Sequence, residues 1–368
     1  MNTIIKNNKE YKLIGYFDND GFDSKGNKFI KPKENKTEWN GKNNFITQLN
    51  FVQLLLKESD YYKKYDINKD CLLCSEKNIT KGRFLWKKYI WEDGLIHYIE
   101  KHNFQPDDMF LDLIFFFKLE HKLKLKSNIT HDKTYDKTYI KINQNQLHIL
   151  DALMEHGGYT KKYLDATNKK IMRYSEHTGL LDFNMNILEK IVVAGNTTRV
   201  DKGDDEIFLP TSIPDILEYE YIFHTHPPTP KPGGRVGGGV LYEFPSMGDL
   251  LHFIDHFNEG KICGSLIVTS EGLYNIRKIK LDREKIKIDE DKLFKKFNEN
   301  FYKIQSKYID LYTTKFTKKD FYEKISQNKK PIEELNNVIN EFNIHVDYYP
   351  RIKIKTNWIL DKVYLPIF

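Results

Sequence analysis

The chain has 368 residues, a formal net charge of +6 at pH 7 and three cysteines. This length is enough for two units, each with its own core. The mild positive charge permits an acidic partner but does not indicate a nucleic acid. The low cysteine count excludes a disulfide framework and suits a reducing compartment.

Targeting signals are missing from the sequence as well. No apolar run approaches the roughly 20 residues that cross a bilayer, and the N-terminal segment lacks the apolar core of a signal peptide. We therefore expect a soluble intracellular protein of the cytoplasm or nucleus, with no membrane contact. The abundance of Lys, Asn, Ile and Tyr is typical of AT-rich genomes, such as those of amoebae, parasites and large DNA viruses. A viral protein of this kind would act in the host cytoplasm.

Residues 1–130 are expected to form an N-terminal unit. Short strands and turns are predicted over 1–44, followed by a helix over 45–57. Two pairs of metal-ligand residues follow, Cys71-x2-Cys74 and His97-x4-His102. Both pairs fit tetrahedral zinc, although the loop between them exceeds the usual length of about 12–15 residues. Because four protein ligands would close the site, we predict a structural zinc in a module of about residues 66–120.

Two other interpretations of this module stay open. The four residues could be reduced thiols and scattered imidazoles that bind no metal. The module could also bind nucleic acid, because basic residues cluster beside it. Acidic residues interleave with the basic ones, which favours a stapled small domain over a nucleic-acid site. The basic residues are Lys81, Arg83, Lys87 and Lys88, and the acidic ones are Glu92, Asp93 and Glu100.

The middle of the chain predicts an α/β domain over residues 143–285. A short tandem repeat that ends at Tyr139 indicates a linker over 131–142. Apolar spacing then predicts helices and strands in alternation. The helices are expected at 144–155 and 247–257, and the strands at 191–194, 219–223, 265–269 and 272–279. This order predicts a mixed sheet with flanking helices.

Two histidines end one of these predicted strands. His224 and His226 stand at positions i and i+2, which project from the same face of a strand about 7 Å apart. Asp249 follows in the first turn of the helix predicted at 247–257. Two imidazoles and one carboxylate are the ligands of a zinc site that keeps one position open, as a catalytic zinc requires.

Hydrolysis at such a zinc also needs a base. The zinc-bound water has a pKa of about 7, and a carboxylate must take its proton and pass it on. Glu176 is the candidate, because Gly179 and an apolar run follow it and place it at the mouth of a buried strand.

Simpler interpretations exist for each element taken alone. The HxH pair could be two strand histidines, Glu176 a solvated acid, and Ser246 with Asp249 a helix cap. Other zinc patterns fail, because a nucleobase deaminase needs H-x-E with P-C-x-x-C and no HExxH is present. His252 and His256 are expected on a half-exposed helix flank rather than on a metal.

Taken in order, these elements resemble the JAMM (MPN-plus) zinc metalloproteases. The resemblance covers residues 143–285 and implies an MPN-like core and hydrolysis of isopeptide bonds to ubiquitin or ubiquitin-like proteins. It also implies that Glu176 acts as general base and then acid, and that Ser246 donates a hydrogen bond to the oxyanion. The implied zinc ligands are His224, His226 and Asp249. The matching elements are Glu176 with Gly179, His224-x-His226-Pro227 and Ser246-x-x-Asp249.

One departure from that family concerns the loop after the histidines. Ser246 lies 20 positions after His226, where the family has a short loop. The extra residues, 228–245, include Pro228, Pro230 and Pro232 and a glycine-rich run over 233–239. No Gly-Lys-Ser/Thr follows, so the run is not a phosphate-binding loop. We expect a mobile insertion beside the metal that acts as a substrate lid.

Residues 286–368 are predicted to be a helical C-terminal extension, helical from Glu290 to about Asn340. Its tail, residues 348–368, alternates apolar and polar residues and could add an edge strand or hold a protein partner. The leading hypothesis is a zinc-dependent isopeptidase with one catalytic and one structural Zn²⁺. The alternatives are a non-catalytic MPN-like scaffold or zinc-finger interaction protein, and a JAMM-like peptidase on small peptides.

Overall fold

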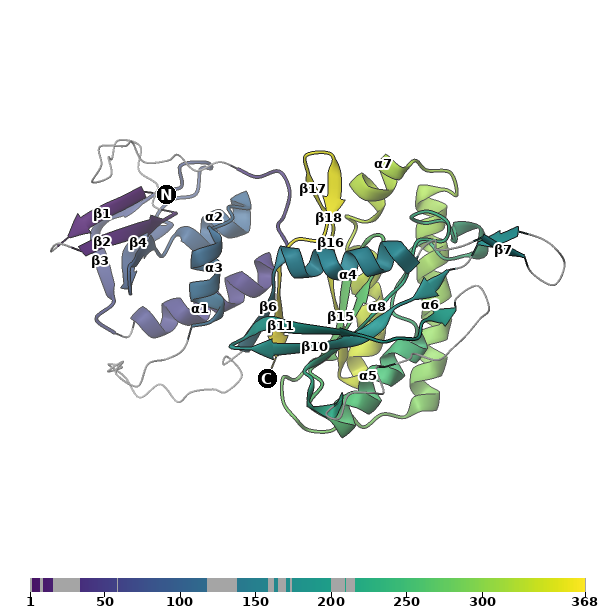
Figure 1. Ribbon diagram of the computed structural model, residues 1–368. Coiled ribbons are helices and arrows are strands. Elements are labelled where there is room, and N and C mark those ends of the chain that lie inside the picture. Colours follow the sequence, from purple (N-terminus) through teal and green to yellow (C-terminus); the bar gives the residue numbers. More distant parts are fainter. Residues whose placement is uncertain are drawn as a thin grey trace. The chain divides into compact units, whose positions relative to one another are not determined.

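A computed structural model describes residues 2–6, 9–15, 34–57, 59–117, 138–157, 162–164, 170–172, 174–199, 209 and 216–367. The chain forms two compact units, Met1–Tyr139 and Ile140–Phe368 (Figure 1). The predicted repeat at 132–139 lies largely outside the described residues. Among the described residues, no helix combines the length and the apolar character needed to cross a bilayer.

The described residues of the first unit form a five-stranded sheet with the strand order β1-β2-β5-β4-β3 and three helices. Phe45, Trp91 and Phe110 form the centre of its core, with the Phe110 ring edge-on to both other rings. The expected helix at 45–57 is confirmed as α1. The strands are β1 Asn2–Lys6, β2 Lys9–Ile14, β3 Tyr62–Lys69, β4 Thr80–Trp86 and β5 Tyr89–Glu92, and the helices are α1 Lys42–Lys57, α2 Leu95–His102 and α3 Asp108–Phe115.

The second unit is built on an eight-stranded mixed sheet with the order β16-β15-β14-β13-β10-β11-β6-β19. The expected mixed α/β class is therefore confirmed. The sheet strands are β6 Thr138–Ile142, β10 Thr178–Asn184, β11 Ile187–Val193, β13 Tyr221–Thr225, β14 Gly264–Val268, β15 Gly272–Lys278, β16 Ile344–Pro350 and β19 Val363–Ile367.

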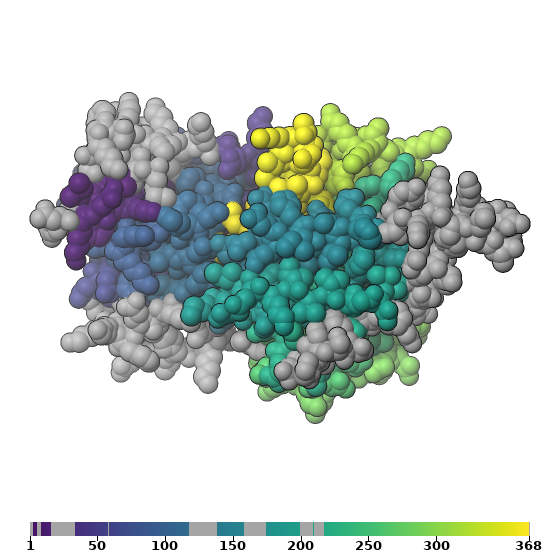
Figure 2. All heavy atoms as spheres, viewed as in Figure 1, coloured from purple at the N-terminus to yellow at the C-terminus, as the bar shows by residue number. Residues whose placement is uncertain are grey.

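Helices cover both faces of this sheet. On one face, α4 (Gln144–Gly157) packs through Leu147 and Leu150 against the strand residues Phe223 and Leu266. This helix and the β10–β11 hairpin lie on the face shown in Figure 2. The other face carries α5 (Met247–Glu259), α6 (Glu290–Tyr312) and α8 (Lys330–Ile339). The parallel neighbours β13 and β14 are joined through α5, as parallel strands require a crossover.

Smaller elements complete the second unit. The β10–β11 hairpin turns at Met185 and Asn186, which both have positive φ, as a two-residue hairpin turn demands. The remaining elements are β7 Lys162–Leu164, β8 Lys170–Met172, β9 Ser175–Glu176, β12 Thr198–Arg199, β17 Ile352–Ile354, β18 Asn357–Ile359, α7 Lys318–Asp320, a π-helical turn Phe321–Ile325, and 3-10 turns at Ile216–Glu218, Val236–Gly238 and Asn340–Phe342.

Two predicted boundaries differ from the structure. Residues 138–142 of the predicted linker form β6, because Tyr139, Ile140 and Ile142 are apolar enough to be buried in the sheet. Residues 286–368 are not a separate extension, because they share one compact unit with the sheet. The edge strand predicted for the tail is confirmed by β19, which lies at one edge of the sheet.

Candidate metal centres

Both histidines face the α5 side of the sheet, His224 from strand β13 and His226 from the residue after it. The residues of β13 alternate between the two cores: Phe223 packs with α4, and Ile222 packs with α5. His224 lies two residues after Ile222 on the strand, so it projects from the same face and faces α5. Thr225 points the other way, as predicted, and its hydroxyl accepts a hydrogen bond from the backbone N–H of His177 at 3.0 Å.

The start of α5 supplies the carboxylate. Ser246 is the N-cap residue, and its hydroxyl accepts from the Asp249 N–H at 3.2 Å. Asp249 returns the contact, because its Oδ2 accepts from the Ser246 N–H at 2.6 Å. This reciprocal capping box fixes the Asp249 side chain at the helix start. The simpler interpretation of the Ser-x-x-Asp element as a helix cap is thus confirmed. The cap leaves Asp249 Oδ1 beside the His224 imidazole.

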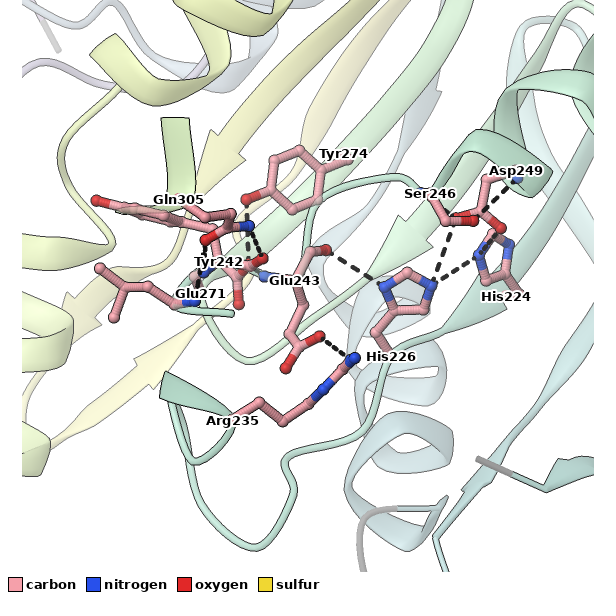
Figure 3. Close-up of polar contacts among 11 residues, drawn as sticks. His224, His226, Arg235, Tyr242, Glu243, Ser246, Asp249, Glu271, Tyr274 and Gln305 are labelled. Atoms are coloured by element: carbon pink, nitrogen blue, oxygen red, sulfur yellow. Dashed lines mark hydrogen bonds and ion pairs between the residues drawn. The ribbon is translucent and has the colours of Figure 1, made fainter. Parts of the chain in front are cut away.

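The three predicted ligands converge on one point (Figure 3). The His224 Nε2 atom lies 3.2 Å from His226 Nε2 and 3.0 Å from Asp249 Oδ1. His226 Nε2 lies 3.6 Å from Asp249 Oδ2. A tetrahedral ion with bonds of about 2.0–2.1 Å holds neighbouring ligand atoms about 3.3 Å apart. The three distances are close to this spacing, with His224 and His226 facing different oxygens of Asp249.

Electrostatics favour a neutral imidazole at His226 and an ionised carboxylate at Asp249. Burial lowers the pKa of His226 to about 4, so its imidazole is neutral at pH 7 and can bind a metal. Burial alone would raise the pKa of Asp249, but His224, His226 and the Ser246 N–H outweigh it and hold that pKa well below its usual range. One ionised carboxylate thus lies among imidazoles in a site where His224 and Asp249 are almost fully buried.

Glu176 lies beside this cluster. It belongs to the short strand β9, where it pairs with Thr198 of β12. With His226, Asp249 and Ser246 it lines a cavity of about 780 Å³. Burial raises the pKa of Glu176 to about 7, against the opposing charge of His224. Of the two interpretations of Glu176, the structure thus favours a half-buried acid at the cavity over a fully solvated one.

His252, one helical turn after Asp249, lines the same cavity. Its ring packs against that of His256, with a centroid distance of 4.4 Å. Neither histidine belongs to a cluster of candidate metal ligands among the residues that the structure describes. Both side chains are half-buried on the flank of α5, as expected.

The insertion at 228–245 differs from the mobile lid that we expected. Leu241, Tyr242 and Phe244 are buried in the core beneath α5 and α6. Gln305 of α6 clamps the chain here: its Oε1 accepts from the N–H groups of Leu241 and Tyr242, and its Nε2 donates to the Tyr242 carbonyl. The second half of the insertion is thus a wall of the cavity, because its alternating aromatic residues are driven into the core.

Three residues near the site were missed in the sequence. Arg235 donates to Glu243 Oε2 at 2.8 Å, and both line the cavity. Burial raises the pKa of Glu243 to about 8, against the opposing charge of Arg235. The fully buried Glu271 accepts from the Glu243 N–H at 2.6 Å. The apolar alternation of residues 241–244 could have indicated this buried segment, but no sequence signal singles out Glu271.

The second cluster lies in the first unit, where the predicted Cys71, Cys74, His97 and His102 come together. Cys71 Sγ lies 3.3 Å from His102 Nε2, and Cys74 Sγ lies 3.4 Å from His97 Nε2. A tetrahedral ion with Zn–S of about 2.3 Å and Zn–N of about 2.0–2.1 Å would place such S and N atoms about 3.5 Å apart. The long loop between the pairs is accommodated because strands β4 and β5 occupy it.

A glutamate carboxylate lies near the Nδ1 atom of each histidine of this cluster. His97 Nδ1 lies 3.5 Å from a Glu76 oxygen, and His102 Nδ1 lies 3.7 Å from a Glu34 oxygen. Each ring therefore turns Nε2 to a thiol. His97 Nδ1 faces the Glu76 carboxylate, whereas the buried His102 Nδ1 has no hydrogen-bond partner among the described residues. Each cluster thus has the donor set of a metal site.

Comparisons with known proteins leave the chemistry open. No protein-family model matches the chain, and no solved structure is similar to it. The chain is 31% identical over 323 residues to Uncharacterized protein R413 of Acanthamoeba polyphaga mimivirus, across 83% of this chain and 86% of the relative. The chain therefore belongs to the same family as this mimivirus protein.

Proposed function

We propose that the chain is a zinc-dependent isopeptidase that hydrolyses conjugates of ubiquitin or ubiquitin-like proteins. The observation that carries the proposal is the convergence of His224, His226 and Asp249 beside a cavity that Glu176 and Ser246 also line. Three ligands leave a fourth position open, as a hydrolytic zinc requires. The motif order, which resembles JAMM metalloproteases, supports the isopeptide substrate and an MPN-like core.

Zinc, when bound, supplies a Lewis acid and lowers the pKa of water. Glu176 takes the proton from the attacking water and passes it to the departing amine. Because its pKa is about 7, the group can hold and release a proton at neutral pH. Ser246 accepts from the Asp249 N–H, so its own hydroxyl hydrogen can be donated to the oxyanion of the substrate. Such a contact lowers the barrier by about 3 kcal/mol.

We infer a structural role for the Cys71, Cys74, His97 and His102 cluster. Four protein ligands leave no position for water or substrate. Zinc held there would staple α2 to the segment after β3, because the cysteines lie in that segment and the histidines on α2. The inferred place of action is the cytoplasm or nucleus, where thiolates stay reduced.

The test is hydrolysis of a panel of diubiquitin linkages and ubiquitin-like conjugates by the zinc-loaded chain. We expect cleavage that a chelator abolishes and that Glu176→Gln lowers by about 10²–10⁴-fold. Asp255→Asn is the matched control, because Asp255 is an exposed acid that lines the same cavity; its rate should stay within about threefold of wild type. Failure to cut any conjugate sinks the substrate, and full activity of Glu176→Gln sinks the mechanism.

A further inference from the structure

The imidazole of His226 has to be held in one tautomer to bind a metal. Its Nε2 lies among the other ligand atoms, at 3.2 Å from His224 Nε2. A metal needs a lone pair on Nε2, so the ring hydrogen has to sit on Nδ1. His226 Nδ1 lies 3.3 Å from the Glu243 carbonyl oxygen, which can accept that hydrogen (Figure 3). The orientation of the Glu243 carbonyl thus selects the metal-binding tautomer.

The same peptide segment is held on its other side by Glu271. The Glu243 N–H donates to Glu271 Oε1 at 2.6 Å, and the Tyr274 hydroxyl donates to the same oxygen at 3.1 Å. The short distance from nitrogen to carboxylate oxygen is typical of a strong hydrogen bond. Glu271 therefore fixes residue 243 from the side opposite to the metal cluster.

Glu271 itself lies on a rigid support, in the turn between β14 and β15. The Thr269 hydroxyl and the Gly272 backbone hydrogen-bond across this turn. Arg351 donates to the carbonyls of Ser270 and Thr269, at 2.8 and 2.7 Å. A fully buried carboxylate on such a turn can set the position of a neighbouring peptide segment.

We propose that Glu271 is a positioning residue of the metal centre, which acts on His226 through the backbone of Glu243. The insertion is then part of the metal site rather than a cover for it. The inference rests on the metal site of the proposed function but not on its substrate. Outer partners of metal-bound histidines typically change metal affinity by about 10–100-fold, and this range sets the expected effect.

Two variants separate geometry from charge. Glu271→Asp keeps the carboxylate but shortens the side chain by one methylene, so the contact with the Glu243 N–H is lost. Glu271→Gln keeps the length and an acceptor oxygen but removes the charge. We expect Glu271→Asp to weaken Co²⁺ binding at the His224 site by about 10–100-fold, and Glu271→Gln to stay within about threefold of wild type. Tyr274→Phe removes the second donor to Glu271 Oε1 but leaves the contact with the Glu243 N–H, so it should weaken Co²⁺ binding less than Glu271→Asp.

Binding is read from the visible spectrum of Co²⁺ in competition with a chelator, and the thiolate site serves as an internal reference. The His226 tautomer is read independently from imidazole ¹⁵N shifts of the metal-free protein, which should show Nδ1–H in wild type and a mixture in Glu271→Asp. Unchanged affinity and tautomer in a folded Glu271→Asp variant overturn the inference. So does a loss in Glu271→Gln as large as that in Glu271→Asp, because charge would then be the cause. A wild-type site that binds no metal refutes the proposed function instead.

Discussion

The burial of Gln305 makes a prediction about the stability of the second unit. Its amide makes hydrogen bonds of 2.9, 3.1 and 2.8 Å to three backbone groups of Leu241 and Tyr242. Gln305→Leu would leave these three groups buried and unpaired. Each such group costs about 1–3 kcal/mol, so the variant should lose at least about 3 kcal/mol of unfolding free energy.

Native-state hydrogen exchange of the β14 amides measures this loss in the second unit alone. Lys303→Leu is the matched control, because Lys303 is exposed on the same helix; a surface change of this kind stays within about 0.5 kcal/mol. A loss below 1 kcal/mol in Gln305→Leu would show that the 241–244 segment is not clamped as described.

Three further predictions concern other parts of the chain. Removal of metal with a chelator should abolish the protection of α2 amides against hydrogen exchange, while the β14 amides stay protected. The reason is that metal binding to such a cluster contributes about 10–16 kcal/mol to folding. Unchanged exchange in α2 would refute a structural metal. Burial would raise the pKa of Asp347, but Arg277, which donates to both of its oxygens at 2.7 and 2.9 Å, holds that pKa below its usual range. The stabilisation is therefore present above the unfolded pKa of about 3.9 and is lost as pH falls through the folded pKa. Asp347→Asn should thus lower the free energy of unfolding by about 3 kcal/mol at pH 7 and by less toward pH 3, as measured by urea titration. A loss that does not change with pH would contradict this prediction. Gly179→Ala would place a Cβ 2.0 Å from the Val192 carbonyl oxygen and should lower the free energy of unfolding by about 3 kcal/mol. An unchanged thermal unfolding midpoint would disprove this prediction.

Local patterns predicted much of the fold. The Ser246 cap and the spacing of apolar residues indicated α5, which begins at Met247. The i, i+2 spacing of His224 and His226 predicted that both imidazoles lie on one side of a strand. In the structure they do so at the end of β13, with His226 one residue beyond it. These features depend on neighbours within a few residues, which a sequence displays directly.

Features that depend on distant contacts could not be predicted in this way. Glu271 and Gln305 act on residues 241–243 from 28 and 63 or 64 positions away. The glycine-rich run suggested mobility for the whole insertion, but burial of Tyr242 and Phe244 dominates its second half. Residues 138–142 were predicted to end a linker. They form a strand because they pair with β11 and β19, which lie far away in the sequence.

The central claim is that the chain holds two metal ions, one of them at an open histidine and aspartate site. Elemental analysis of the purified chain after zinc loading tests it most directly. We predict two zinc ions per chain in wild type and one in the His224→Ala/His226→Ala variant, with the Cys71 and Cys74 site still filled. Equal zinc content in wild type and this variant would contradict the account.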